Sequence, residues 1–197
     1  EASQYGLERG VHLQDILGLI KKVRQSVDTP ICLMTYYNPV FCFGDKKFAG
    51  AAAASGVDGL IIPDLPAEEG KAFIRLMSGF GLDVILFLAP TTTLKRSRFI
   101  SRLSRGFIYY VSLTGVTGVR QGLPAGLCAK LKKVKRITSK PVCVGFGVSG
   151  PKQSRQIYKI ADGAIVGSAV VKKIKQNLQR KDLVKKVSAF VSTLKDV

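Results

Sequence analysis

Three glycine-containing turns follow strand-like segments in the second half of the sequence. They are TGVTG at Thr114–Gly118, GFGVSG at Gly145–Gly150 and GSAV at Gly167–Val170. The last two run into helix-starting residues, Pro151 and Ser168. Backbone N–H groups at a helix N-terminus bind phosphate, and glycine leaves such groups accessible. We therefore expect Gly145 and Gly147 to allow a close approach to the main chain, with a phosphate as the approaching group.

Ordinary turn geometry would explain any one of these turns taken alone. The repetition of the same feature at neighbouring strand ends, twice with a helix start, favours a phosphate site.

The elements that must position these turns alternate along the chain. Strand-like segments occupy residues 31–36, 59–64, 83–90, 107–113, 141–147 and 163–168, and helical patterns occupy residues 12–27, 48–55, 68–80, 94–103, 125–137, 152–160 and 182–194. The strands are apolar at both odd and even positions, which is typical of parallel strands covered on both faces. The residues before His12 are expected to form a loop. The pattern predicts a single α/β domain over residues 1–197.

Two parallel architectures fit this pattern, an open doubly wound sheet and a closed (β/α)₈ TIM barrel. Phosphate sites in barrels often lie after the seventh and eighth strands. The position of the glycine turns therefore favours the barrel, with strands 3 to 8 in this chain and two more expected before Glu1.

Composition restricts the range of functions. The 197 residues carry a formal net charge of +18, but the lysines lie among apolar residues at helical spacing, so we expect solvated helix faces and no nucleic-acid partner. No apolar run is long enough for a membrane helix. Four scattered cysteines and one histidine indicate neither a disulfide framework nor a metal site. A soluble protein of the cytoplasm, or of the plastid stroma in a plant, fits this composition.

Several longer strings resemble the tryptophan synthase alpha chain family. They are LMTYYNPVF (33–41), DGLIIPDLPAEE (58–69), LAPTTT (88–93), FIYYVSLTGVTG (107–118), VGFGVS (144–149) and DGAIVGSAVV (162–171). The resemblance implies a TIM barrel that cleaves indole-3-glycerol phosphate to indole and glyceraldehyde 3-phosphate and passes indole to a beta subunit.

The resemblance also implies roles for individual residues. Phosphate ligands would be Gly118, Phe146, Gly147, Gly167 and Ser168, and the indole pocket would comprise Tyr36, Ile61, Phe87, Tyr109, Thr117 and Phe146. Tyr109 would lie beside the reacting carbon in a supporting catalytic role, and Thr117 would help to close the site. Asp64, Leu65 and Pro66 would meet the beta subunit.

The resemblance implies no cofactor in this chain, because pyridoxal phosphate belongs to the beta subunit. The family's catalytic glutamate and aspartate would precede Glu1, so we expect negligible activity from these residues alone. Asp64 is the one acidic residue expected at a strand's carboxyl end, and it is a poor substitute because its implied role is interfacial. The alternative is a non-catalytic relative that binds a phosphate ligand or the beta subunit.

Overall fold

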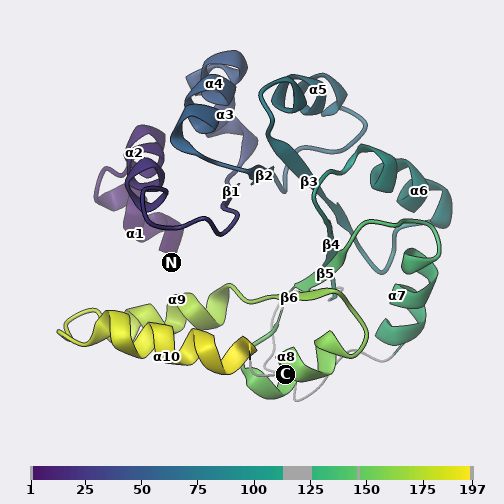
Figure 1. Ribbon diagram of the computed structural model, residues 1–197. Helices are drawn as coiled ribbons and strands as arrows, with labels where there is room; N and C mark the ends of the chain where they lie inside the picture. Colours follow the sequence, from purple (N-terminus) through teal and green to yellow (C-terminus); the bar gives the residue numbers. More distant parts are fainter. Residues whose placement is uncertain (1, 113–125, 146, 196–197) are drawn as a thin grey trace. The chain divides into compact units, whose positions relative to one another are not determined.

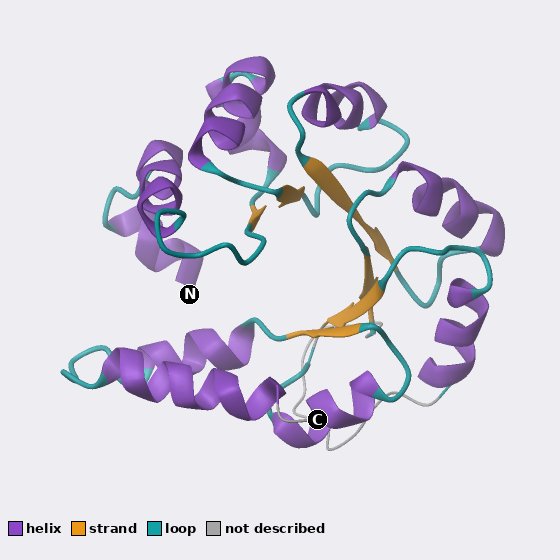
Figure 2. Cartoon of the chain, viewed as in Figure 1, coloured by secondary structure: helices purple, strands orange, loops and turns teal. Residues whose placement is uncertain are grey.

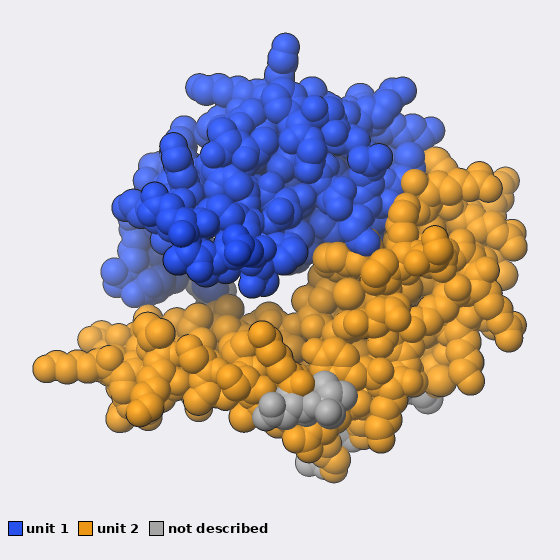
Figure 3. All heavy atoms as spheres, viewed as in Figure 1, with its two compact units in different colours: residues 1–86, 103–106 blue, residues 87–102, 107–197 orange. Residues whose placement is uncertain are grey.

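The computed structural model describes residues 2–112, 126–145 and 147–195, in which helices alternate with strands (Figure 1). The chain divides into two compact units, which Figure 3 colours separately. Unit 1 comprises residues 1–86 and 103–106, and unit 2 comprises residues 87–102 and 107–197.

Unit 1 contains three parallel strands and five helices among its described residues. In chain order these are α1 (Ala2–Glu8), α2 (Leu13–Val23), β1 (Cys32–Met34), α3 (Tyr37–Phe43), α4 (Asp45–Ser55), β2 (Gly59–Ile61), α5 (Lys71–Gly79) and the first part of β3 (Asp83–Leu88). β2 pairs with β1 on one side and with β3 on the other. Its three residues are all buried, as expected for a strand covered on both faces.

The alanine-rich helix α4 lies at the centre of the helical layer of unit 1 and packs against α2, α3 and α5. Ala49 and Ala52 are fully buried together with Phe48, because small side chains let neighbouring helices approach closely. The helix ends at Gly56, whose φ of +84° lies in the left-handed region where glycine is favoured.

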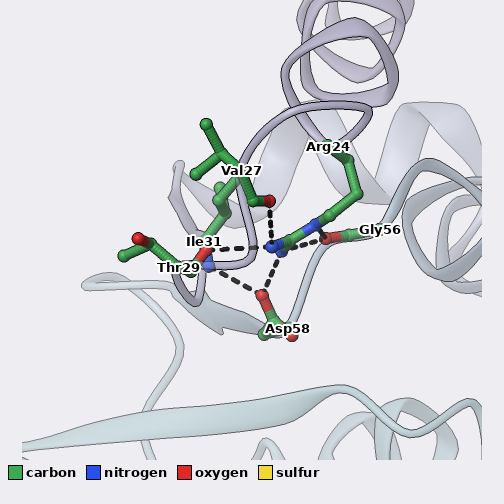
Figure 4. Close-up of polar contacts among 6 residues, drawn as sticks. All are labelled: Arg24, Val27, Thr29, Ile31, Gly56 and Asp58. Atoms are coloured by element: carbon green, nitrogen blue, oxygen red, sulfur yellow. Dashed lines mark hydrogen bonds and ion pairs between the residues drawn. The ribbon is translucent and has the colours of Figure 1, made fainter.

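Arg24, just after α2, joins three segments of unit 1 (Figure 4). Its guanidinium donates to the carbonyl oxygens of Val27, Thr29 and Gly56 and to the carboxylate of Asp58. The same carboxylate accepts the N–H of Ile31, with an N–O distance of 2.7 Å. The cluster therefore fixes the end of α2, the entry to β1 and the entry to β2.

Unit 2 also contains three complete parallel strands, with five helices among its described residues (Figure 2). In chain order these are α6 (Leu94–Leu103), β4 (Ile108–Val111), α7 (Leu127–Lys135), β5 (Val142–Gly145), α8 (Pro151–Tyr158), β6 (Gly163–Ile165), α9 (Ser168–Lys175) and α10 (Leu183–Lys195). β5 pairs with β4 and with β6. Ile108, Tyr110, Val142, Val144 and Ile157 are almost completely buried and form much of the core of this unit.

The cluster around Asp58 has a counterpart around Asp162 in unit 2. Asp162 accepts the N–H of Val142 and a proton of the Lys135 ammonium group, both at 2.8 Å. In each unit the aspartate is followed by a glycine that pairs with a cysteine, Gly59 with Cys32 and Gly163 with Cys143. Partial burial acts to raise the pKa of Asp162, but the hydrogen bonds from Lys135 and Val142 outweigh it and the pKa is lowered.

The predicted positions of the six strands are confirmed, although several strands are shorter than expected. Two expectations were wrong. Residues 2–8 form helix α1 where we expected a loop, and β1 and β6 are not buried on both faces. The reason for the second difference is that, among the described residues, β1 and β6 each have one paired neighbour. The helix α3, absent from the predicted pattern, has Pro39 in its first turn, where a missing N–H is tolerated.

Candidate active site

Strand register brings the glycine turns of unit 2 to one edge of its sheet. Gly145 pairs with Ile165 in parallel, so Gly147 and Gly167 each lie two residues beyond a matched position. From the neighbouring strand, Ser112 donates both its N–H and its hydroxyl to the Gly145 carbonyl, each at 3.0 Å. The carboxyl ends of β4, β5 and β6 therefore converge.

The turn after β5 combines an exposed glycine with a capped helix start. Gly147 has a φ of +78°, a conformation that glycine adopts without strain. Gly150 is the N-cap of α8, and Pro151 is its first residue. The N–H and hydroxyl of Ser149 both donate to the Gln153 side chain, at 2.7 and 2.8 Å. Ser149 is therefore tied to the first turn of α8 through the Gln153 side chain.

The turn after β6 offers a more open helix start. Gly167 is the N-cap of α9 and Ser168 is its first residue, and both are exposed. A Cβ atom added at Gly167 would meet nothing within 4 Å. The first amides of an α-helix have no acceptor within the helix, so the exposed start of α9 has backbone donors of the kind that bind anions. Gly118 and Phe146, the other predicted phosphate ligands, lie outside the described residues.

Tyr109 of β4 is held by two neighbours. Its ring lies 4.7 Å from that of Phe87, centroid to centroid, with an angle of 36° between the planes. On the adjacent strand, a Cβ atom at Gly145 would lie 2.4 Å from the phenol oxygen. Burial raises the pKa of Tyr109 above its usual value, so the phenol keeps its proton at neutral pH. It can donate a hydrogen bond to a substrate, but it is a poor general base.

The sequence predicted a close approach to the main chain at Gly145, and the phenol of Tyr109 from the neighbouring strand makes one. Gly147 and Gly167 lie beyond the strand ends, and both are exposed.

The other predicted indole-pocket residues fall in different environments. Ile61 is buried, with 8% of its surface exposed, and pairs with Met34 across β1 and β2. Tyr36 is the N-cap of α3 and is 64% exposed. The structure thus brings Phe87 and Tyr109 together in unit 2, whereas Tyr36 and Ile61 belong to unit 1. Thr117 lies outside the described residues.

The predicted partner-binding residues lie in the loop after β2. Asp64 and Pro66 are exposed, and Leu65 packs against the main chain at Gly70. The Asp64 carboxylate accepts the N–H of Tyr37, at 2.9 and 3.2 Å to its two oxygens. Asp64 therefore fixes the start of α3, a role that the sequence did not indicate.

Replacing Asp64 by alanine should lower the free energy of unfolding by about 1 kcal/mol, because the first amide of α3 loses its acceptor. Asp64→Asn keeps an acceptor oxygen and should cost less than half as much. Urea unfolding of the two variants measures the difference. Equal losses would show that the negative charge of Asp64 matters and that its hydrogen bond to Tyr37 does not.

Across residues 2–112, 126–145 and 147–195, no cluster of three or more His, Cys, Asp or Glu side chains could hold a metal ion. The helices in these ranges are all too short or too polar to cross a bilayer.

The whole chain, residues 1–197, matches the family model described as tryptophan synthase alpha chain. The alpha chain of Carboxydothermus hydrogenoformans is 46% identical over 200 residues, which cover 100% of this chain and 75% of that protein. The alpha chain of Geobacter sulfurreducens is 42% identical over 195 residues, covering 99% of this chain and 74% of that protein.

Solved structures give the same result. A chain of the tryptophan synthase α2β2 complex of Pyrococcus furiosus superposes with a TM-score of 0.88 at 36% identity, covering 97% of this chain and 77% of that one. The alpha chain of Legionella pneumophila gives 0.85 at 33% identity, covering 95% and 70%. On sequence and structure together, this chain belongs to the tryptophan synthase alpha chain family.

Proposed function

We propose that this chain provides the substrate-binding part of a lyase that cleaves indole-3-glycerol phosphate to indole and glyceraldehyde 3-phosphate. The observation that carries the proposal is at the carboxyl edge of the sheet in unit 2, where the Tyr109 phenol reaches Gly145, the last residue of β5, and the Gly147 and Gly167 turns follow β5 and β6 in register. The substrate has an aromatic ring at one end and a phosphate at the other, and this edge offers an aromatic pair and an open helix start.

The phosphate would bind at the exposed turns around Gly147, Gly167 and Ser168, with Gly118 and Phe146 completing its ligands. The indole would lie against Phe87 and Tyr109. The resemblance assigns Tyr36, Ile61 and Thr117 to indole binding as well. The family's complete fold is a (β/α)₈ barrel, and the six parallel strands of this chain would supply strands 3 to 8.

Cleavage is a retro-aldol reaction that breaks the bond between the indole ring and the glycerol chain. A proton must be delivered to the ring carbon, and a base must take the proton of the hydroxyl group that becomes the aldehyde. Tyr109, whose pKa is raised by burial, would orient the substrate by donating a hydrogen bond. The resemblance implies that the family's glutamate and aspartate, which would exchange the protons, are not among residues 1–197.

No cofactor is needed for these proton transfers, and pyridoxal phosphate would remain with the partner beta subunit. That partner would bind at Asp64, Leu65 and Pro66.

The proposal is tested by following indole release from indole-3-glycerol phosphate. The 197-residue chain alone should release none above the uncatalysed rate. Addition of the segment of the Carboxydothermus relative that carries the two carboxylates should restore release, and Tyr109→Phe should reduce it. Rapid release by the chain alone would contradict the assignment of the carboxylates. A folded complex that binds substrate without releasing indole would contradict the lyase itself.

A further inference from the structure

The charge of this protein is segregated between its two units. Unit 2 contains 22 of the 31 Lys and Arg residues but 3 of the 13 Asp and Glu residues, so it carries the entire excess of positive charge. No acidic residue occurs between Asp83 and Asp162. Unit 1 is nearly neutral by the same count. The unit that contains Gly147, Gly167 and Ser168 is therefore the strongly basic one.

Part of this charge lies where helix physics disfavours it. The first turns of α6, α7 and α8 contain Lys95, Lys130 and Lys152, all exposed, and none of these turns contains an acidic residue. The N-terminus of a helix is the positive end of its dipole, so a lysine there is destabilising. In unit 1 the first turns of α2 and α4 contain the favourable Asp15 and Asp45, although α5 begins with Lys71.

The unfavourable lysines are at one end of their helices for a topological reason. In a parallel βα unit, the first turn of each helix follows the carboxyl end of the preceding strand. α6 follows β3, α7 follows β4, and α8 follows β5. Lys95, Lys130 and Lys152 are therefore on the side of unit 2 where the glycine turns converge. These lysines contradict the preference of a helix N-terminus for acidic residues. Repeated exceptions on one side of a unit indicate a function for that side.

We propose that Lys95, Lys130 and Lys152 attract the phosphate dianion of the substrate over long range to the edge formed by Gly147, Gly167 and Ser168. This inference rests on the proposed function. The three lysines act through their field and are not ligands of the phosphate. A field of one sign at the mouth of a site raises the local concentration of an oppositely charged ligand, and salt weakens it because the Debye length shortens.

A matched pair of triple variants tests the assignment. The first variant is Lys95→Gln, Lys130→Gln and Lys152→Gln, in the first turns. The second is Arg102→Gln, Arg136→Gln and Lys159→Gln, which removes the same charge from exposed residues at the opposite ends of the same helices. Calorimetric titration with glycerol 3-phosphate at about 10 mM and about 150 mM ionic strength gives the dissociation constants.

At the lower ionic strength the first variant should bind glycerol 3-phosphate about three- to tenfold more weakly than the unaltered protein, and the second less than about twofold. At the higher ionic strength the difference should nearly disappear. The first variant should also melt no lower than the unaltered protein, because it removes unfavourable helix charges, whereas the second should melt lower.

Two results would overturn the inference, and they are distinguishable. In the first, the unaltered protein binds glycerol 3-phosphate and both variants lose the same affinity. The position of the basic residues on their helices would then have no effect on binding, and the proposed function would stand. No binding of glycerol 3-phosphate to the unaltered protein at either ionic strength would remove the proposed function and the inference with it.

Discussion

Replacing Gly145 by alanine will force the ring of Tyr109 out of its place beside Phe87. The added Cβ would lie 2.4 Å from the phenol oxygen and 2.6 Å from two ring carbons, distances that no relaxed structure contains. The atoms belong to a buried ring packed against Phe87, so the ring has little room to yield. We expect a loss of about 1–3 kcal/mol in the free energy of unfolding from overpacking. Indole binding should weaken with the loss of the Phe87–Tyr109 pair.

Urea unfolding and titration with indole measure the two effects. The matched control is Gly18→Ala in α2, where an added Cβ meets nothing within 4 Å. That change should stabilise the protein by about 0.5–1 kcal/mol, because alanine is the better helix former. Combining Gly145→Ala with Tyr109→Ala should cost less than the sum of the single changes, since the second removes the group with which the first collides. Strict additivity would show that the two residues do not touch.

The change Arg24→Ala should lower the free energy of unfolding by about 3 kcal/mol. It removes every bond of the guanidinium to three carbonyl oxygens and the Asp58 carboxylate. Hydrogen bonds that involve charged groups contribute more than neutral ones, and acceptors left without partners add a further cost. Arg24→Lys should recover less than half of the loss, because one ammonium group cannot reach acceptors on three segments.

The similar contact between Lys135 and Asp162 in unit 2 supplies a control for this prediction. Lys135→Ala removes one cation from the equivalent aspartate. The expected loss in the free energy of unfolding is about 1 kcal/mol, because the Lys135 side chain is 38% exposed and donates one hydrogen bond to Asp162. Chemical denaturation of the three variants compares them directly. An Arg24→Ala loss no greater than that of Lys135→Ala would show that the carbonyl contacts of Arg24 do not stabilise the fold.

The parts of the fold that sequence predicted correctly are those with a strong local pattern. Helix α6 begins and ends at the predicted residues, Leu94 and Leu103, because its buried positions recur at helical spacing. The apolar runs located all six strands for the same reason. The N-terminal helix α1 was missed because it has no buried residue and so shows no apolar periodicity. Helix α3 was missed because its seven residues are too few to show a helical pattern and because proline is unfavourable inside a helix.

The candidate site was predicted in two different ways. The glycine turns followed from physical reasoning, because exposed backbone amides at helix starts bind anions whatever the surrounding sequence. The roles of Tyr109 and Asp64 came from the family resemblance. The contacts of Gly145 with Tyr109 and of Asp64 with Tyr37 were not predicted, because each joins residues at least 27 positions apart. A glycine inside a predicted strand was the one available signal for the first contact.

We expect a phosphate dianion to bind at the turns after β5 and β6. Backbone amide chemical shifts of the labelled protein during titration with glycerol 3-phosphate test it most directly. Binding at these turns should give saturable shifts at Gly147, Gly167 and Ser168, with small changes at the control glycine Gly18. Shifts that are confined to other residues, or that are absent while the protein remains folded, would contradict it.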